Sequence, residues 1–375
     1  MNKKKIKVLH CIETMGSGGV EQLKYAVSKY IDTNTFDQVV VCSKVKNNFD
    51  HRFKKLGIPV YPIGELKKLY NLPYYWRLIR RVRKEKPDIL HGAVFEGVIS
   101  AVLAGIICRI PVIIIEETSE PLNRSSRGSR LLKFLASYAR WVIAISPSVK
   151  TYLHQVAGIP EEKIKLINYA VDKPEPPSSG ETNELKESLG ITADDFVIGS
   201  VGRLRDFHKR FSDLIKAAAT LRDACPGLKL LIVGDGEDME SLKTLAKQCQ
   251  MEDRVIFAGY QSNTTLYYSC MDAFALVSHM EAFGLVVVEA MFMKLPVIVT
   301  AVGGMKDIVI NGTTGLLVQP HDLDAIAAAI KTLYNDREQG IAFGQAGYVR
   351  AGEYYSVQQH AREVQDLYLS SLKSS

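Results

Sequence analysis

Residues 278–291, which read SHMEAFGLVVVEAM, constrain the fold more than any other part of the chain. Apolar segments of strand length lie on either side of them, at residues 271–277 and 295–300. The pattern predicts a strand, a loop that contains Glu281, a helix that begins near Gly284 and carries Glu289, and a second strand. Strands that alternate with helices in this way favour an α/β domain with a parallel sheet.

The loop and the helix of this segment have the chemistry of a site for sugars and phosphates. The N-terminus of a helix provides free N–H groups and a partial positive charge for an anion, and Gly284 would let the backbone approach that anion closely. Glu281 and Glu289 could accept hydrogen bonds from hydroxyls. Either glutamate alone could instead be a solvated surface acid, but Glu289 lies among valines and an alanine, where a carboxylate is costly without a partner.

The two glutamates, Glu281 and Glu289 with seven residues between them, closely resemble the motif of the retaining family 4 glycosyltransferases, which have the GT-B fold. The resemblance implies an α/β chain of two Rossmann-like domains whose parallel sheets face each other across a cleft. It implies transfer of a sugar from a nucleoside diphosphate with retention, without a metal ion or other cofactor. Glu281 would then bind sugar hydroxyls and Glu289 the ribose. The neighbouring residues that would also contact the donor are Ala282, Phe283, Gly284 and Leu285.

A second segment shares this resemblance. Residues 196–201 read as a strand, Gly202-Arg203-Leu204 follows it, and Lys209 comes a few residues later. A strand-to-helix loop with two basic side chains suits a diphosphate. Isolated basic residues need have no such role, but the resemblance implies that Arg203 and Lys209 neutralise the leaving nucleoside diphosphate. Tyr260, at the end of a predicted strand, would lie near the base.

Length and composition agree with a two-domain cytosolic protein. The chain has 375 residues, and its six cysteines are scattered without a Cys-x-x-Cys pair or a zinc pattern, which favours a reducing compartment and no metal site. Residues 6–12 follow several lysines but are too short and too polar for a signal peptide, so we expect a strand there. The sequence contains no uninterrupted apolar run of about 18 residues, the length that would span a membrane.

Charge is divided unevenly along the chain. Residues 1–172 contain 28 lysines and arginines and 15 acidic residues, a net charge of +13, while the rest of the chain carries −7. A basic half favours an anionic partner. Residues 66–86 mix basic, aromatic and aliphatic residues, and they form either an ordinary surface helix or a patch that binds an anionic membrane surface. Nucleic acid is disfavoured because no nucleic-acid-binding motif is present.

The first half of the chain offers two further candidate sites. Gly16, Gly18 and Gly19 follow the first predicted strand and open a helix, an arrangement that can cradle a phosphate or serve packing alone. The glycine spacing does not match the dinucleotide-binding fingerprint, which disfavours a nicotinamide enzyme. In the resembled family, this loop closes over the donor diphosphate.

The second candidate site lies at the ends of two predicted strands, beyond which ligands of parallel sheets bind. The family often has a histidine near the position that Glu116, Glu117 and Thr118 occupy here, so its usual acceptor contact is in doubt. His91, at the end of residues 88–91, is the nearest substitute, with a catalytic or a structural role. Arg124 and Arg127 follow in a loop that could hold acceptor phosphates or contact lipid.

The Pro- and Ser-rich composition of residues 173–181 marks a linker between the domains. We therefore expect an N-terminal acceptor-side domain at 1–172, a nucleotide-sugar-binding domain at 182–355, and a helix at 356–375 that crosses back to the first domain.

The combined interpretation is a hexosyl- or N-acetylhexosaminyltransferase. It would transfer a sugar from a nucleoside diphosphate to a hydroxyl of a lipid-linked, oligosaccharide or surface-polysaccharide acceptor. UDP is the expected nucleotide because it is the most frequent in the resembled family. The reaction would take place in the cytoplasm, at the inner face of the cell membrane. Two alternatives remain open: a non-catalytic subunit that binds a nucleotide sugar, and a nucleotide-sugar epimerase of the same fold.

Overall fold

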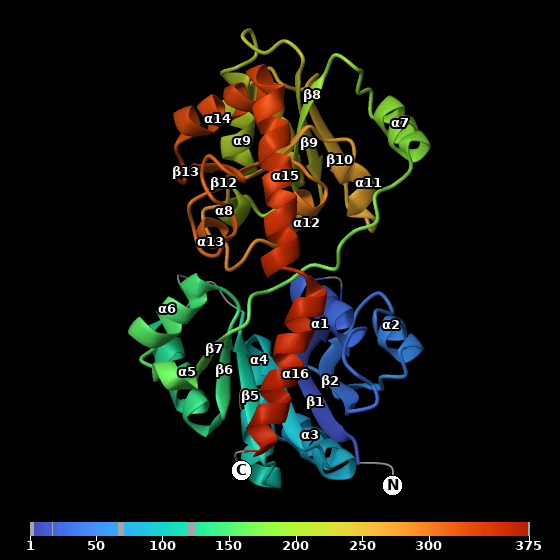
Figure 1. Ribbon diagram of the computed structural model, residues 1–375, viewed down its shortest axis with the longest axis vertical. Helices are drawn as coiled ribbons and strands as arrows, with labels where there is room; N and C mark the ends of the chain where they lie inside the picture. The colour runs from blue at the N-terminus through green and yellow to red at the C-terminus, as the bar shows by residue number, and fades with distance from the viewer. Residues whose placement is uncertain (1–3, 17, 67–70, 119–124, 374–375) are drawn as a thin grey trace. The chain divides into compact units, whose positions relative to one another are not determined.

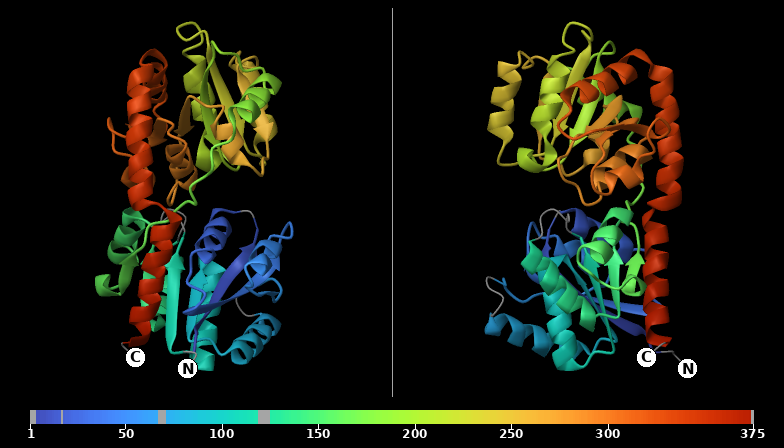
Figure 2. Two further views of the ribbon diagram at one scale, coloured as in Figure 1. Left: turned by 45° about the vertical axis from the view of Figure 1, so that its right-hand side comes forward. Right: turned by 90° about the vertical axis from the view of Figure 1, so that its left-hand side faces the viewer.

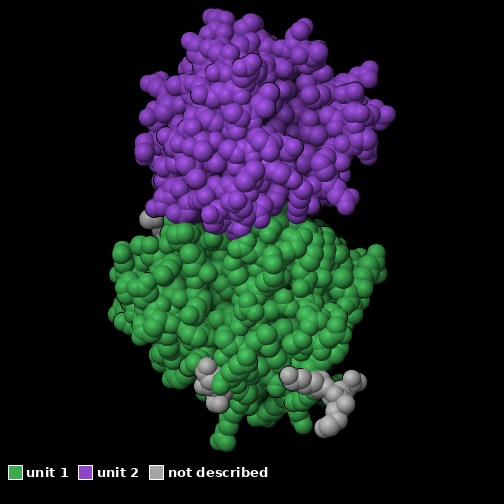
Figure 3. All heavy atoms as spheres, in the orientation of Figure 1, with its two compact units in different colours: residues 1–172, 356–375 green, residues 173–355 purple. Residues whose placement is uncertain are grey.

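The chain forms two compact units, each built on a parallel sheet. The structure, a computed structural model, describes residues 4–16, 18–66, 71–118 and 125–373. Unit 1 consists of residues 1–172 and 356–375, and unit 2 consists of residues 173–355 (Figure 3). The expected α/β class with two Rossmann-like domains is confirmed.

Unit 1 has a seven-stranded sheet in the order β3-β2-β1-β4-β5-β6-β7, with every neighbouring pair parallel (Figure 1). Its strands are β1 (Ile6–Met15), β2 (Phe36–Val45), β3 (Val60–Pro62), β4 (Ile89–Ala93), β5 (Val112–Glu117), β6 (Trp141–Ala144) and β7 (Ile164–Leu166). Its helices are α1 (Gly19–Ser28), α2 (Asp50–Lys55), α3 (Leu72–Glu85), α4 (Val94–Cys108), α5 (Ser126–Tyr138), α6 (Pro147–Gln155), the 3-10 helix Glu161–Lys163 and α16 (Val357–Lys373).

Unit 2 has a six-stranded sheet in the order β10-β9-β8-β11-β12-β13, again entirely parallel. Its strands are β8 (Phe196–Val201), β9 (Leu228–Val233), β10 (Val255–Gly259), β11 (Ala273–Leu276), β12 (Val297–Thr300) and β13 (Gly315–Val318). Its helices are α7 (Ser179–Ser188), α8 (Asp206–Lys209), α9 (Phe211–Ala219), α10 (Met239–Gln248), α11 (Thr264–Tyr268), α12 (Leu285–Phe292), α13 (Met305–Ile308), α14 (Leu323–Asn335) and α15 (Arg337–Tyr354).

Both faces of the sheet in unit 1 are covered by helices, which explains the apolar strands. Val39 and Val41 of β2 pack with residues of α3 and α4, whereas Val40 and Cys42 pack on the opposite face with Phe53 of α2. A strand buried on both faces needs apolar side chains at successive positions, in place of the alternation of a half-exposed strand. α4 packs against both α3 and α5, and α16 lies beside α1 (Figure 2).

The last helix joins the N-terminal sheet although unit 2 separates the two in sequence. A bridge between Val171 and Ser356 and a 3.2 Å hydrogen bond from Val357 N to Val171 O mark where the chain leaves unit 1 and re-enters it. Tyr368 of α16 is buried against Phe36 of β2.

Two glycines of α15 offer a matched test of packing in unit 2. A Cβ at Gly344 would lie 2.0 Å from the carbonyl oxygen of Lys294, whereas a Cβ at Gly352 would meet nothing within 4 Å. Gly344→Ala should destabilise unit 2 by about 1–3 kcal/mol because the backbone has to move. Gly352→Ala should stabilise it by roughly 0.5–1 kcal/mol, since alanine loses less entropy in a helix. Urea unfolding measures both changes, and equal effects would contradict the close approach of α15 to residue 294.

Candidate functional site

The candidate site of unit 2 lies at the carboxyl ends of its strands, where ligands of parallel sheets bind. Arg203 follows β8, Tyr260 follows β10, and the loop that contains Glu281 follows β11. Tyr260 is 60% exposed, so its ring is available for contact. Residues that are far apart in sequence thus reach one edge of the sheet.

Lys209 and Glu281 form an ion pair that joins two of these loops. Lys209 Nζ donates a hydrogen bond to Glu281 Oε2, and both side chains are only partly exposed. Lys209 is the last residue of the short helix α8, five residues after Leu204. Arg203 is exposed, and its guanidinium has no ion-pair partner recorded within the described part of the chain. Among the described residues, Lys209 is therefore paired and Arg203 is not.

The N-terminus of α12 lies beside this pair. Gly284 occupies the position just before the helix with a φ of 106°, a left-handed conformation that glycine adopts without strain. A Cβ on Gly284 would lie 3.7 Å from Cγ of Glu281, and no side chain caps the helix. Gly304, after β12, lies so close to this loop that a Cβ there would be 2.8 Å from the carbonyl oxygen of Ala282. The first amides of α12 are thus held close to Glu281, whose carboxylate is paired with Lys209, and a helix N-terminus offers N–H donors to an anion.

Glu289 lies one turn further along α12 in a nearly apolar setting. Its side chain is partly accessible, and its carboxylate accepts a 2.8 Å hydrogen bond from Tyr268 OH. Burial raises the pKa of Glu289 to about 7, and the hydrogen bond from Tyr268 only partly opposes this. No cation partner is recorded for this carboxylate among the described residues, and Tyr268 is a partner that sequence reasoning did not identify.

In unit 1, the glycine-rich loop joins β1 to α1. A Cβ at Gly16 would meet nothing closer than 3.7 Å, and Gly18 has an ordinary φ of −72°. A Cβ at Gly18 would approach only the flexible carboxylate of Glu21, and Gly19 is the first residue of α1. The fold itself therefore does not require glycine at positions 16 and 18.

His91 and Glu116 come together in a buried polar cluster of unit 1. Glu116 Oε2 accepts hydrogen bonds from Lys24 Nζ at 2.7 Å and from His91 Nε2 at 3.1 Å, and its Oε1 accepts one from Tyr169 OH at 2.5 Å. The other ring nitrogen of His91 is 2.6 Å from Tyr368 OH on α16. Both carboxylate oxygens of Glu116 and both nitrogens of His91 are thus occupied.

These contacts shift the pKa values of the cluster. Burial, reinforced by the charge of Lys24, lowers the pKa of His91 to about 4. Burial alone would raise the pKa of Glu116, but Lys24 and His91 outweigh it and hold that pKa well below the ordinary range. The pair is therefore an ionised carboxylate and a neutral imidazole at neutral pH. The partners of Glu116 come from three distant segments, so no local sequence pattern could have revealed them.

The remaining acceptor-side candidates differ in accessibility. Glu117 is buried, Thr118 is half-buried and Arg127 is exposed at the start of α5. Arg124 lies outside the described residues. Among the described residues there is no group of three His, Cys, Asp or Glu side chains placed to hold a metal ion. The described helices also include none that is long and apolar enough to cross a membrane.

Comparison with known families agrees with this geometry. The model of "Glycosyl transferases group 1" matches residues 181–350, and that of "Glycosyltransferase Family 4" matches residues 17–173. The chain belongs to the family 4 glycosyltransferases. It is thus a GT-B enzyme that uses a nucleotide-sugar donor, and the resemblance seen in the Glu281–Glu289 motif is confirmed.

Related glycosyltransferases are found in bacterial surface-polysaccharide synthesis. The capsular polysaccharide biosynthesis glycosyltransferase CapM of Staphylococcus aureus is 28% identical over 315 residues, which are 80% of this chain and 81% of CapM. The lipopolysaccharide core biosynthesis mannosyltransferase LpsB of Rhizobium meliloti is 28% identical over 249 residues, 64% of this chain and 68% of LpsB. The crystal structure of Anabaena Alr3699/HepE in complex with UDP-glucose shares the fold, with a TM-score of 0.86, 24% identity and coverage of 97% of this chain and 100% of that one.

The raised pKa of Glu289 predicts a pH-dependent effect of Glu289→Gln on stability. The pKa of Glu289 is about 7 in the folded protein, against an ordinary value of 4.5. The folded state therefore keeps the proton at pH values where the unfolded chain has lost it, and the free energy of unfolding falls as pH rises from 4.5 through 7. Glutamine removes the charge and can still accept from Tyr268. The variant should therefore unfold at a higher temperature than the wild type at pH 8, by roughly 2–4 °C for each kcal/mol gained, and by much less at pH 5.

Calorimetry at the two pH values checks this double difference. Glu240→Gln, which changes an exposed acid of α10, is the matched control and should have little effect at either pH. An equal effect of Glu289→Gln at both pH values would show that burial does not hold the proton on Glu289.

Proposed function

We propose that the chain transfers a hexosyl or N-acetylhexosaminyl group, with retention, from a UDP-sugar to a hydroxyl of a lipid-linked or surface-polysaccharide acceptor. The observation that carries this proposal is the Lys209–Glu281 ion pair beside the uncapped N-terminus of α12, with Arg203 exposed on the neighbouring turn. Positive groups gathered at one edge of a sheet suit the diphosphate of a nucleotide sugar.

In the proposed reaction, the protein acts mainly through electrostatics. Arg203, Lys209 and the first amides of α12 stabilise the negative charge that develops on the departing nucleoside diphosphate. Glu281 orients Lys209 and accepts hydrogen bonds from sugar hydroxyls. The acceptor hydroxyl attacks the face of the sugar from which the diphosphate leaves and gives its proton to the departing diphosphate oxygen, which yields retention without a protein nucleophile or a metal ion.

The nucleoside end of the donor would lie further along the same edge. Glu289 accepts hydrogen bonds from the ribose, and Tyr260 contacts the base. The partial accessibility of Glu289 and the exposure of Tyr260 support these roles. Ala282, Phe283, Gly284 and Leu285 would contact the donor through their position on the loop and first turn of α12. In unit 1, Gly16, Gly18 and Gly19 would also contact the donor, and the lack of a steric need for glycine at positions 16 and 18 among the described residues supports this role for those two.

The choice of UDP, and of a surface glycan as acceptor, rests on related proteins. Alr3699/HepE has the same fold and was crystallised with UDP and with UDP-glucose. CapM and LpsB are named for capsular polysaccharide and lipopolysaccharide core synthesis.

The acceptor side is proposed to lie at the carboxyl end of β5 in unit 1. Thr118 and Arg127 are the accessible groups there, whereas Glu116 and Glu117 are buried. His91 has both nitrogens occupied, so its proposed contribution is to hold Glu116 rather than to touch the reacting atoms.

We also propose that the enzyme works in the cytoplasm, bound to the inner face of the cell membrane. One face of α3 supports this: Leu72 is 76% exposed and Trp76 is 61% exposed, and Arg80 lies 5.4 Å from the ring centroid of Trp76. Arg83 and Lys84 are also exposed near the end of this helix. Apolar side chains next to basic ones are the combination that binds the surface of an anionic bilayer.

A nucleotide panel tests the donor site. UDP should raise the unfolding temperature more than GDP, ADP or CMP, because a ligand at about 100 times its Kd adds about 2.7 kcal/mol. Glu289→Ala should weaken the shift through loss of the ribose contact. Lys209→Met should also weaken it, and should lower turnover of the UDP-sugar by about 100-fold or more through loss of charge stabilisation.

Lys216→Met is the control for Lys209→Met, since Lys216 is an exposed lysine of α9. It should leave the UDP shift and the turnover unchanged. No shift of the wild type with any nucleotide would contradict the site assignment.

Vesicle sedimentation tests the membrane proposal. The protein should bind vesicles that contain phosphatidylglycerol and stay in solution with phosphatidylcholine alone. Reversal of three charges on α3 should weaken binding by roughly 100-fold, since each basic residue near an anionic surface contributes about 1 kcal/mol. The variant is Arg80→Glu, Arg83→Glu and Lys84→Glu.

A triple variant of unit 2 with the same change of charge is the control, at the exposed positions Lys243, Lys247 and Lys331. It should bind vesicles like the wild type. Equal loss of binding in both triple variants would show that net charge alone determines vesicle binding, and would contradict α3 as the binding surface.

A further inference from the structure

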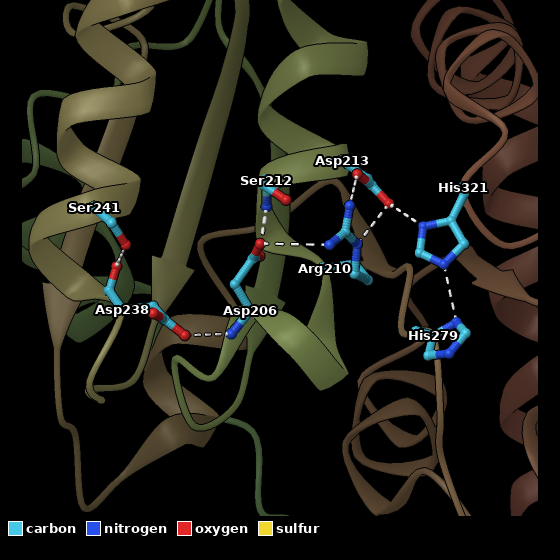
Figure 4. Close-up of polar contacts among 8 residues, drawn as sticks. All are labelled: Asp206, Arg210, Ser212, Asp213, Asp238, Ser241, His279 and His321. Carbon is cyan, nitrogen blue, oxygen red and sulfur yellow. Dashed lines mark hydrogen bonds and ion pairs between the residues drawn. The ribbon is translucent and has the colours of Figure 1, made fainter. Parts of the chain in front are cut away.

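Asp206, the first residue of α8, hydrogen-bonds the segment that carries Lys209 to two neighbouring parts of unit 2. The backbone N–H of Asp206 donates to Asp238 Oδ2 at 2.7 Å, and its carboxylate accepts from the backbone N–H of Ser212 at 2.8 Å (Figure 4). These bonds fix α8 between the turn after β9 and the start of α9. Lys209 is the last residue of this fixed segment.

Arg210, the residue after Lys209, is held in an unusual conformation. Its φ of 55° and ψ of 39° are left-handed, which is costly for a residue with a side chain. Its guanidinium makes two parallel hydrogen bonds to the carboxylate of Asp213, from Nε at 2.9 Å and from Nη2 at 2.7 Å. Asp213 is only 3% exposed. The chain thus turns sharply at the residue after Lys209, and a buried carboxylate holds that turn.

A second left-handed residue meets the same carboxylate from another loop. His321 follows β13 with a φ of 65°, and its Nδ1 is 3.1 Å from Asp213 Oδ2. Burial alone would raise the pKa of Asp213, but Arg210 and then His321 outweigh it and leave the pKa below the ordinary value. An ionised Asp213 only accepts hydrogen bonds, so Nδ1 of His321 carries the proton and donates.

The chain of contacts continues to the loop that carries Glu281. Nε2 of His321 is 2.9 Å from Nδ1 of His279, and the backbone N–H of His279 donates to the carbonyl oxygen of His208 at 2.8 Å. In the neutral rings, His279 Nδ1 donates to His321 Nε2. His279 is two residues before Glu281, and His208 is directly before Lys209. Figure 4 shows Arg210 and His321 converging on Asp213, with His279 beyond His321.

We propose that Arg210, Asp213, His321 and His279 form a relay of positioning residues that sets the geometry of Lys209 and Glu281 for the departing diphosphate. The relay joins the loops after β8, β11 and β13, and no member of it needs to touch the donor. Two costly backbone conformations persist at one site only when the surrounding contacts determine them. Electrostatic stabilisation of a transition state depends on such fixed placement of charge. This inference rests on the proposed function of Lys209 and Glu281.

His321→Gly separates positioning from plain stability. Glycine is relaxed in the left-handed conformation, and Asp213 keeps both bonds to Arg210, so the variant should unfold within a few degrees of the wild type. The relay is nevertheless cut. We expect kcat for the UDP-sugar to fall at least tenfold with a change in KM below threefold, because the lost effect acts mainly in the transition state.

Gln250→Gly is the matched control. Gln250 is exposed two residues after the end of α10 with a φ of 56°, so glycine relieves the same kind of strain away from the relay. Its kcat and KM should equal those of the wild type. His321→Asn separates the two arms of the relay: asparagine tolerates the left-handed conformation and its Nδ2 can replace Nδ1 toward Asp213, but it does not reach His279. An intermediate kcat is expected.

The outcomes distinguish this inference from the function on which it rests. Wild-type kcat in His321→Gly, or a loss of kcat that follows a loss of folded protein, overturns the relay while the enzyme remains a transferase. A wild-type protein that neither binds UDP in calorimetry nor turns over the UDP-sugar overturns the proposed donor site and the relay with it.

Discussion

Parallel pairing of the strands is the constraint on which the rest of unit 2 depends. Because all six strands run in one direction, the loops at their carboxyl ends meet at one edge of the sheet. Lys209 and Glu281 are 72 residues apart in sequence, yet this edge brings them into an ion pair. The same edge places the N-terminus of α12 against Glu281 and lets a histidine after β13 reach a carboxylate of α9.

The sequence predicts the parts of the site that depend on local order, and it predicts much less of what depends on distant partners. The strand, loop and helix around Gly284 and the α/β class follow from hydrophobic pattern and glycine placement, and the structure confirms the class. Lys24 and Tyr169, which meet Glu116 from other elements, leave no trace in the residues around it. The left-handed conformation of Arg210 also could not be predicted from the sequence, because an arginine just before a helix looks like any other surface cation in the sequence.

Two glutamates show how environment divides residues of one type between roles. Glu116 has a buried lysine, a histidine and a tyrosine as partners, and these hold it ionised although it is buried. Among the described residues, Glu289 has only a tyrosine hydroxyl as a partner, and burial raises its pKa to about 7. A satisfied buried carboxylate stabilises one arrangement of the chain. A carboxylate with spare acceptor capacity in an apolar setting favours a ligand that brings hydroxyl donors to it.

The return of the chain to unit 1 has a consequence for the order of folding. Unit 2 is in effect an insertion between Val171 and Ser356, two residues that are paired in the folded protein. On the ribosome, unit 2 has its complete sequence before α16 exists, whereas the sheet of unit 1 lacks the helix that buries Tyr368 against His91 until residues 357–373 are made. Unit 1 therefore completes its fold after unit 2, in contrast to the usual sequence of domain folding during synthesis.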